Sequence, residues 1–170
     1  MSTELNFSTQ IKQKIIAANW KMNGSDELLK EFSTFATNKD NDVIICLPFT
    51  LLDSAKTLLP NFIKIGAQNC NEEDKGAFTG EISASMLQEK GVSHVLIGHS
   101  ERRTLFKETD AVIFKKAESA IKNKLTPIIC IGETLSEKKA NKTLEVLNSQ
   151  IDGSIIKLNT DEPVIVAYEP

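Results

Sequence analysis

At residues 94–103 the chain reads His94-Val95-Leu96-Ile97-Gly98-His99-Ser100-Glu101-Arg102-Arg103, a short apolar run followed at once by polar and charged side chains. An unbroken run of this kind is typical of a strand buried on both faces, and the charged residues after it predict a short helical turn. In sheets built from β-α units, chemistry lies at the carboxyl ends of the strands. The stretch therefore predicts a parallel β-α architecture with His99 at a functional strand end.

The same pattern recurs along the whole chain. Further strands are expected at 15–18, 43–47, 62–65, 127–131 and 164–167, with amphipathic helical stretches between them, including one after Ser25 or Asp26, one at 104–122 and one at 136–151. This alternation predicts a parallel sheet with right-handed crossovers. An open doubly wound sheet and a (β/α)8 barrel both fit. The absence of G-x-G-x-x-G after the first strand favours the barrel.

Size and composition indicate one globular domain. Of 170 residues 41% are hydrophobic and 25% charged, and the net charge of −3 gives no basic surface for nucleic acid or a membrane. Three dispersed cysteines and two histidines argue against a metal site or a disulfide framework. Residues 1–13 read as a polar tail without a secretory h-region, and residues 14–170 as the domain. We expect a cytoplasmic protein.

Polar side chains follow the expected strands. Asn19 and Lys21 follow the first strand, His99 the fourth, and Glu169 the sixth. In a closed barrel these strand ends converge on one mouth. A carboxylate base, a hydrogen-bonding imidazole and a cation together suit proton abstraction beside a carbonyl group.

The strand-end motifs carry a resemblance to a known family. They read Asn19-Trp20-Lys21-Met22-Asn23-Gly24, Gly66-Ala67-Gln68-Asn69, Gly98-His99-Ser100-Glu101-Arg102-Arg103, Cys130-Ile131-Gly132-Glu133 and Ala167-Tyr168-Glu169-Pro170. In their order and approximate spacing the chain resembles the triosephosphate isomerase family from about Lys14 to Pro170. The resemblance implies a (β/α)8 barrel, here incomplete, with about six strands and five helices: units one to five and the sixth strand.

What the resemblance implies about function follows the family. The reaction is the interconversion of dihydroxyacetone phosphate and D-glyceraldehyde 3-phosphate through an enediolate, in glycolysis and gluconeogenesis, without a cofactor or a metal. Glu169 is then the proton acceptor and His99 the electrophile, a neutral ring favoured by the backbone N–H groups of the following helical turn. Lys21 attracts the substrate phosphate, and Asn19 orients an oxygen.

Supporting and interface residues are implied in the same way. Glu101 is expected to pair with Lys21 or Asn19, and Cys130 to pack beside Glu169. The loop at 71–80 is expected to insert into a neighbouring subunit of a homodimer, and the residues assigned to this interface are Gln68, Asn69, Thr79, Glu81 and Arg102. His94 is expected to point toward the helical layer and receives no catalytic role.

The sequence departs from the family at its end, because a lid, two further β-α units and the phosphate-binding turns would follow Glu169. Two hypotheses remain. In the first, the chain is the N-terminal portion of an ordinary isomerase, and the coding sequence continues beyond Pro170. In the second, it is a catalytically inactive remnant or an interaction module, and a stop codon follows.

Overall fold

The computed structural model describes residues 14–35 and 41–170, so the expected tail at 1–13 lies outside the described residues. Six parallel strands form one sheet in sequential order. They are β1 (Ile15–Asn19), β2 (Asp42–Leu47), β3 (Ile63–Ala67), β4 (His94–Ile97), β5 (Thr126–Ile131) and β6 (Ile165–Tyr168). Each expected strand is present. The sequential parallel order is that of an incomplete TIM barrel.

Each connection between consecutive strands carries at least one helix. The helices are α1 (Asp26–Phe35), the 3-10 turn η1 (Phe49–Leu51), α2 (Leu52–Leu58), α3 (Ala84–Glu89), α4 (Ser100–Leu105), α5 (Asp110–Lys122), α6 (Leu135–Lys139) and α7 (Thr143–Ser154). Loops before β3, β4, β5 and β6 return the chain to the sheet. All six strands therefore run in the same direction, and their carboxyl ends face the same side.

Two expected helices are each divided in the structure. The stretch 104–122 is split because Lys107 adopts a left-handed backbone, with φ of 59°, and Thr109 caps α5 by accepting the N–H of Val112. The stretch 136–151 is split at Asn141, whose φ is 57°. Left-handed residues end a helix without needing glycine when they are asparagine or are held by neighbouring caps. Hydrophobic spacing alone did not reveal these breaks.

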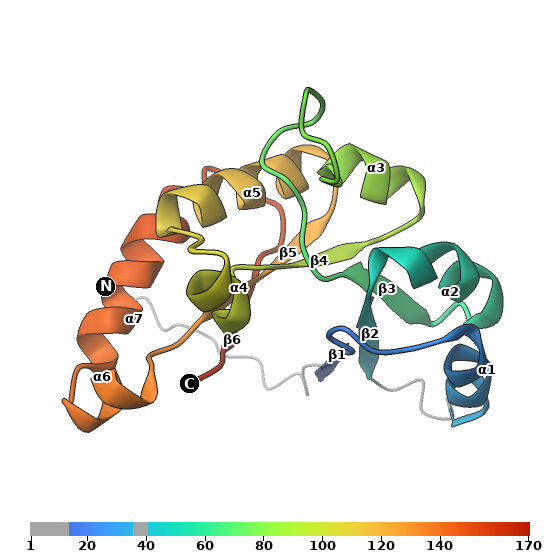
Figure 1. Cartoon of the computed structure of the whole chain (residues 1–170), viewed down its shortest axis with the longest axis horizontal. Helices are drawn as coiled ribbons and strands as arrows, with labels where there is room; N and C mark the ends of the chain where they lie inside the picture. The colour runs from blue at the N-terminus through green and yellow to red at the C-terminus, as the bar shows by residue number, and fades with distance from the viewer. Residues whose placement is uncertain (1–13, 36–40) are drawn as a thin grey trace, which may run out of the picture.

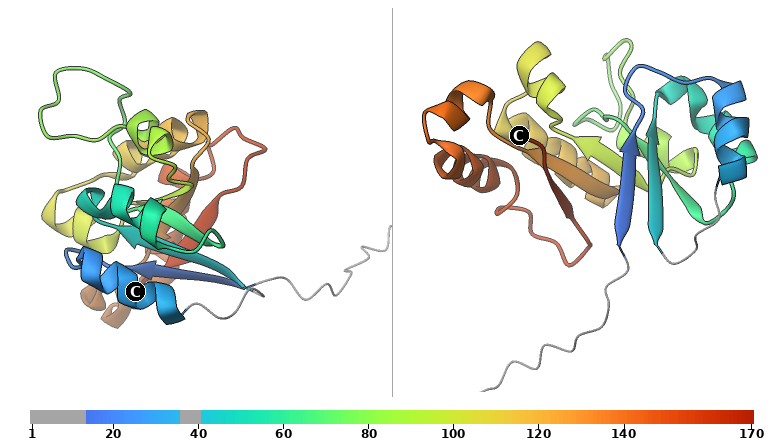
Figure 2. Two further views of the ribbon diagram at one scale, coloured as in Figure 1. Left: turned by 90° about the vertical axis from the view of Figure 1, so that its right-hand side faces the viewer. Right: turned by 90° about the horizontal axis from the view of Figure 1, so that it is seen from below.

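The sheet curves, and the helices cover its convex side (Figures 1 and 2). The larger apolar core lies between the sheet and the helices and includes Leu29, Ile45 and Ile113. A smaller cluster lies on the concave face, around Ile44 and Leu96. Because apolar side chains are packed on both faces, the strand sequences are unbroken rather than alternating.

The two edges of the sheet are β1 and β6, and the described residues place no strand beside either outer edge. Ile16 of β1 is 51% exposed, and Val166 of β6 is 47% exposed. The edges face each other across the open side of the curved sheet, as the right-hand view of Figure 2 shows. An unpaired edge leaves backbone N–H and C=O groups available to another strand.

His94 does not point toward the helical layer, and this expectation is wrong. It lies two residues before Leu96, which belongs to the concave-face cluster, and residues two apart on a strand share a face. It is 7% exposed, close to the ion pair of Lys64 Nζ with Asp42 Oδ1 at 3.0 Å. Burial, together with the charge of Lys64, lowers the pKa of His94 to about 4.

Candidate functional site

The carboxyl ends of β1, β4 and β6 bring the expected catalytic residues together. Lys21 Nζ lies 2.8 Å from Glu101 Oε1, which belongs to the same short helix that His99 caps. His99 Nε2 lies 3.3 Å from Glu169 Oε2. Residues separated by as many as 148 positions in the sequence therefore form one cluster, because the parallel strands end side by side.

His99 has its ring orientation fixed by the start of α4. It is the N-cap residue of this helix, and its Nδ1 accepts the backbone N–H of Glu101 at 3.2 Å. A ring nitrogen that accepts a hydrogen bond carries no proton, so the hydrogen of the neutral ring is on Nε2. That N–H is on the side of the ring that faces Glu169.

Glu169 presents a carboxylate oxygen that is buried and unpaired. Its backbone N–H donates to the carbonyl of Ile131 at 2.8 Å, which continues the pairing of β6 with β5 beyond the strand. Its Oε2 is inaccessible and has no hydrogen-bond partner among the described residues, although His99 Nε2 is near. The separation is short enough for contact, but the geometry is not that of a hydrogen bond. This oxygen is therefore left without a partner beside the His99 ring, while the Glu169 side chain as a whole is 38% exposed.

Cys130 packs beside Glu169, as expected from its position at the end of β5. Its side chain belongs to the concave-face cluster. Burial raises the pKa of the Cys130 thiol to about 12, and the neighbouring charge of Glu169 acts in the same direction. Because the reactive form of cysteine is the thiolate, this shift disfavours a nucleophilic role for Cys130 and agrees with a packing role beside Glu169.

Lys21 is held in an unusual backbone conformation by three neighbours. Its φ is 54°, in the left-handed region that costs a residue other than glycine roughly 1–3 kcal/mol. Its N–H donates to Asn19 Oδ1 at 2.9 Å, and its carbonyl accepts from Gln68 Nε2 at 2.9 Å. The expected ion pair with Glu101 is present, and the hydrogen bond and charge of Glu101 raise the pKa of Lys21. Lys21 is thus a positioned cation.

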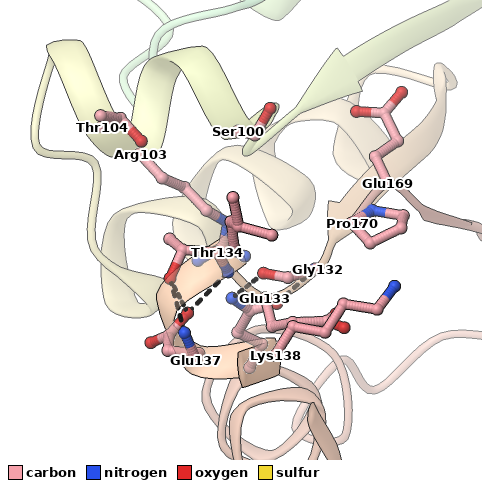
Figure 3. A pocket seen from close by; sticks show the side chains of 12 residues that line it. Ser100, Arg103, Thr104, Gly132, Glu133, Thr134, Glu137, Lys138, Glu169 and Pro170 are labelled. Carbon is pink, nitrogen blue, oxygen red and sulfur yellow. Dashed lines mark hydrogen bonds between the residues drawn. The ribbon is translucent and has the colours of Figure 1, made fainter. Parts of the chain in front are cut away.

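A cavity of about 610 Å³ lies next to this cluster (Figure 3). Glu169 and Pro170 line one side, and Thr134 and Lys138 lie across from them. His99, Lys21 and Asn19 do not line it. The cavity therefore lies beside the cluster of Lys21, His99 and Glu169, and the contacts between these side chains define the candidate site better than the cavity does.

Several side chains that support the site had no signal in the sequence. Arg103 reaches the carbonyls of Gly98 and Cys130. Tyr168 donates its hydroxyl hydrogen to the buried carboxylate of Glu133, at 3.0 and 3.1 Å from its two oxygens. These contacts join residues distant in sequence, so local patterns could not identify them.

The residues expected at an interface fall into two groups. Thr79 and Glu81 are exposed, on the loop that projects between β3 and α3 (Figure 1). Asn69 is buried, and its side-chain oxygen accepts from Lys116 Nζ at 2.9 Å. Gln68 and Arg102 also bind groups of their own chain: Gln68 Nε2 donates to the carbonyls of Lys21 and Cys46, and Arg102 Nε pairs with Glu108 at 2.5 Å.

Two further negative findings concern residues 14–35 and 41–170. This part of the chain contains no group of three or more His, Cys, Asp or Glu side chains arranged to hold a metal ion. None of its helices has the length and apolar character needed to cross a membrane.

Comparison with known proteins gives one consistent result. The family model described as triosephosphate isomerase matches residues 14–170. The triosephosphate isomerase of Bartonella henselae is 48% identical over 162 residues, which are 91% of this chain and 64% of that protein. The triosephosphate isomerase of Alkaliphilus metalliredigens is 46% identical over 167 residues, 94% of this chain and 67% of that protein.

A solved structure shows the same likeness in three dimensions. The crystal structure of triosephosphate isomerase from Bartonella henselae superimposes with a TM-score of 0.86 at 46% identity. The match covers 93% of this chain and 68% of that chain. The chain thus spans about two thirds of the length of the relatives that it matches.

Proposed function

Because this chain belongs to the triosephosphate isomerase family, we propose that the full-length protein interconverts dihydroxyacetone phosphate and D-glyceraldehyde 3-phosphate in the cytoplasm. The observation that carries the proposal is the placement of His99 beside Glu169, with Nε2 and Oε2 at 3.3 Å. Isomerisation of a triose requires a base at carbon and a hydrogen-bond donor at the adjacent oxygen. These two side chains supply both.

Glu169 takes the proton in the proposed reaction. Its partly exposed carboxylate removes a proton from the carbon beside the substrate carbonyl, and the electron pair moves onto the carbonyl oxygen to give an enediolate. The hydroxyl hydrogen passes from its oxygen to the former carbonyl oxygen, so the two oxygens exchange roles, and the same carboxyl group returns the proton to the neighbouring carbon. Because the C–H bond that breaks and the C–H bond that forms are on adjacent carbons, one base serves both steps.

His99 stabilises the charge that develops on oxygen. Its Nε2 hydrogen faces the position beside Glu169, so one small substrate can meet the base with its carbon and the imidazole with its oxygen. A preorganised donor of this type contributes roughly 3–4 kcal/mol to the lowering of a barrier. Because Nδ1 is committed to the Glu101 N–H, the ring donates from Nε2 alone.

Lys21 supplies the positive charge that a phosphorylated triose requires. Its ammonium group is held by Glu101 close enough to Glu169 for the charge of that carboxylate to raise the pKa of Lys21 slightly further. The overall charge of the chain is −3, so an anionic substrate is attracted by this local group and not by the molecule as a whole.

A coupled assay tests this function. Full-length protein is given glyceraldehyde 3-phosphate, and dihydroxyacetone phosphate is detected by its reduction with a dehydrogenase and NADH. We expect turnover that falls by at least about 10²-fold in His99→Gln. His94→Gln is the matched control, since this histidine lies on the same strand-and-turn unit but at the opposite end of β4, and it keeps its activity. Absence of turnover in the unaltered protein would contradict the proposal.

A polypeptide limited to residues 1–170 is expected to lack the activity proposed for the full-length protein. The open edges of the sheet support this expectation. Since β1 and β6 have unpaired sides and Ile16 and Val166 are half exposed, we propose that this polypeptide alone has negligible isomerase activity. Its edges can take strands from another polypeptide. Mixing it with a polypeptide that supplies the remaining strands and measuring recovered turnover distinguishes an incomplete enzyme from an inert remnant.

We also propose that the full-length protein is a homodimer that uses the exposed Thr79 and Glu81 loop. The projection of this loop away from the sheet supports the proposal (Figure 1). Sedimentation of the full-length protein tests it, and a mass equal to one chain would contradict it.

A further inference from the structure

Arg103 has contacts that reach two different strand ends at once. Its Nε donates to the carbonyl of Gly98 at 2.9 Å, and its Nη2 donates to the carbonyl of Cys130 at 3.2 Å. Its remaining terminal nitrogen, Nη1, pairs with Asp110 Oδ1 at 2.5 Å at the start of α5. The side chain is only 17% exposed, so these bonds face little competition from water.

The first of these contacts bears on His99. Gly98 immediately precedes His99, is buried, and has a φ of 70°. A side chain here would meet Ile113, because a Cβ atom on Gly98 would lie 2.7 Å from its Cδ1. The backbone therefore turns sharply between β4 and His99. Arg103 holds the carbonyl at this turn.

The second contact bears on Glu169. Cys130 and Ile131 form the end of β5, and the Ile131 carbonyl accepts the N–H of Glu169. Gly132 lies so close to Glu169 that an added Cβ atom would be 2.1 Å from the Glu169 carbonyl oxygen. The backbone of Glu169 thus follows the position of the β5 end. Any movement of β5 relative to β4 changes the distance between His99 and Glu169.

We propose that Arg103 is a positioning residue that sets the His99–Glu169 geometry by tying the end of β4 to the end of β5. The consequence for catalysis rests on the proposed function, whereas the geometric part does not. Arg103 touches neither reacting group in this arrangement and acts through two backbone carbonyls.

The guanidinium group suits this role better than an ammonium group. Its planar fork presents several N–H donors in fixed directions, so one side chain can bond Gly98, Cys130 and Asp110 at the same time. A lysine at this position keeps the positive charge but has a single nitrogen at the end of a flexible stem. Arg103→Lys therefore separates the effect of charge from the effect of the bridging contacts.

Nuclear magnetic resonance of the full-length protein tests the geometric part. The chemical shifts of the His99 ring nitrogens are measured in the protein with Glu169 intact and in the Glu169→Gln variant. The change in the Nε2 chemical shift between these two proteins reports how closely the two side chains interact. We expect this change in the Nε2 chemical shift to fall to less than half of its original size when Arg103→Met or Arg103→Lys is also present. Asp110→Asn is the matched control, because it removes the ion pair of Arg103 but leaves both carbonyl contacts, and it keeps the full change in the Nε2 chemical shift.

Kinetics of the same variants test the consequence for catalysis. Because misplacement of reacting groups by about 1 Å can cost 10²-fold, we expect Arg103→Met to lower kcat by about that factor. KM should change by less than about threefold, since the substrate-binding cation is untouched. Asp110→Asn should keep kcat within about threefold of the unaltered protein, because both carbonyl contacts of Arg103 remain.

Three results would overturn the proposal. The first is that the change in the His99 Nε2 chemical shift caused by Glu169→Gln keeps its full size in both Arg103 variants. The second is an equal loss in Asp110→Asn, which would assign the effect to the anchoring of α5. The third is failure of both Arg103 variants to fold, which would assign Arg103 a structural role. If the unaltered protein had no isomerase activity, the resonance experiment would still decide the geometric part.

Discussion

His99 Nε2 and Glu169 Oε2 lie 3.3 Å apart without a hydrogen bond between them. Within the described part of the chain, the buried carboxylate oxygen therefore has a donor nearby but no hydrogen-bond partner, and burial without a partner costs free energy. Groups held in this way by the surrounding fold are characteristic of sites where a ligand completes the interaction.

Removing either member of the pair should abolish most of the activity. We expect His99→Ala and Glu169→Ala each to lower kcat of the full-length protein by at least about 10²-fold, because each removes a positioned acid-base or hydrogen-bonding group. Steady-state rates of the coupled assay measure the effect. Glu162→Ala, an exposed carboxylate outside the site, is the control and should leave kcat unchanged. A near-normal rate in either alanine variant would mean that the assigned roles are wrong.

Gly132→Ala should displace Glu169. The added Cβ atom would lie 2.1 Å from the Glu169 carbonyl oxygen, which no packing adjustment short of a backbone shift can relieve. Overpacking of this type costs roughly 1–3 kcal/mol of stability, and here it should lower kcat as well. Gly153→Ala provides a comparison, since its clash is with Asp110 Cβ and not with Glu169. If the two variants lost stability and kept equal rates, Gly132 would have no part in positioning Glu169.

Lys116→Met should be strongly destabilising. Lys116 is 5% exposed, and its Nζ lies 2.6 Å from Glu108 Oε1 and 2.9 Å from Asn69 Oδ1. Its loss leaves a buried carboxylate that keeps only Arg102 as a charged partner, and we expect a fall of about 3 kcal/mol in the free energy of unfolding.

Urea unfolding of the full-length protein measures the Lys116→Met effect. Lys122→Met is the control, because Lys122 forms an exposed ion pair with Asp74 at 2.6 Å, and solvent-exposed pairs of this kind contribute little to stability. Equal unfolding midpoints for the two variants would show that the buried network is dispensable.

His94 should make the protein less stable in mild acid. Burial and then the charge of Lys64 lower its pKa in the folded state to about 4. In the unfolded chain the imidazole of His94 has its ordinary pKa of about 6.5. Between about pH 4 and about pH 6.5 the unfolded state therefore binds more protons than the folded state, and the free energy of unfolding rises with pH. The contribution of neutral His94 to the free energy of unfolding is fully present above about pH 6.5 and is lost as the pH falls toward the folded-state pKa. The loss is on the order of 3 kcal/mol near pH 4.

The measurement is the pH dependence of urea unfolding from pH 7.5 to 4.5. The control is His94→Gln. In this variant the free energy of unfolding should lose the part of its pH dependence that comes from His94 and keep the part that comes from other groups. A variant with the same pH dependence as the unaltered protein would show that His94 is accessible to protons in the folded state.

A polypeptide of residues 1–170 should associate in solution. The unpaired edges of β1 and β6, with Ile16 and Val166 about half exposed, offer sites for strand pairing between molecules. We expect light scattering to increase with concentration and isomerase turnover to be negligible. Introducing a lysine at the exposed Val166 should reduce the scattering, because charged side chains on an edge disfavour strand addition. Turnover near that of the full-length protein would contradict the prediction.

The order and class of the elements could be predicted from the amino-acid pattern alone. Unbroken apolar runs such as 127–131 predicted strands buried on both faces, and the structure places apolar clusters on both sides of the sheet. Helix existence was also predicted, but the breaks at Lys107 and Asn141 were not. A left-handed residue in the middle of an amphipathic pattern leaves the spacing of apolar residues almost unchanged, so periodicity does not reveal it.

The identities of the site residues also came from the sequence, because the strand-end motifs carry them. The motifs predict Lys21, His99 and Glu169 as site residues, and the structure brings them into one cluster in which Lys21 pairs with Glu101 as expected. The orientation of His94 was predicted wrongly. A strand of four buried residues shows no alternation that distinguishes its two faces, so its register had to come from its neighbours.

Only the tertiary structure decided how the site is held. Arg103 donates hydrogen bonds to the backbone carbonyls of Gly98 and Cys130, which lie at the ends of two strands. A local sequence pattern cannot predict contacts of this kind, because they join two strand ends that are distant in the sequence. The sequence fixes which side chains follow each strand, since that is a matter of chain order. The distance between those side chains is set by the curvature of the sheet and by bonds between strand ends, which exist only once the strands have packed.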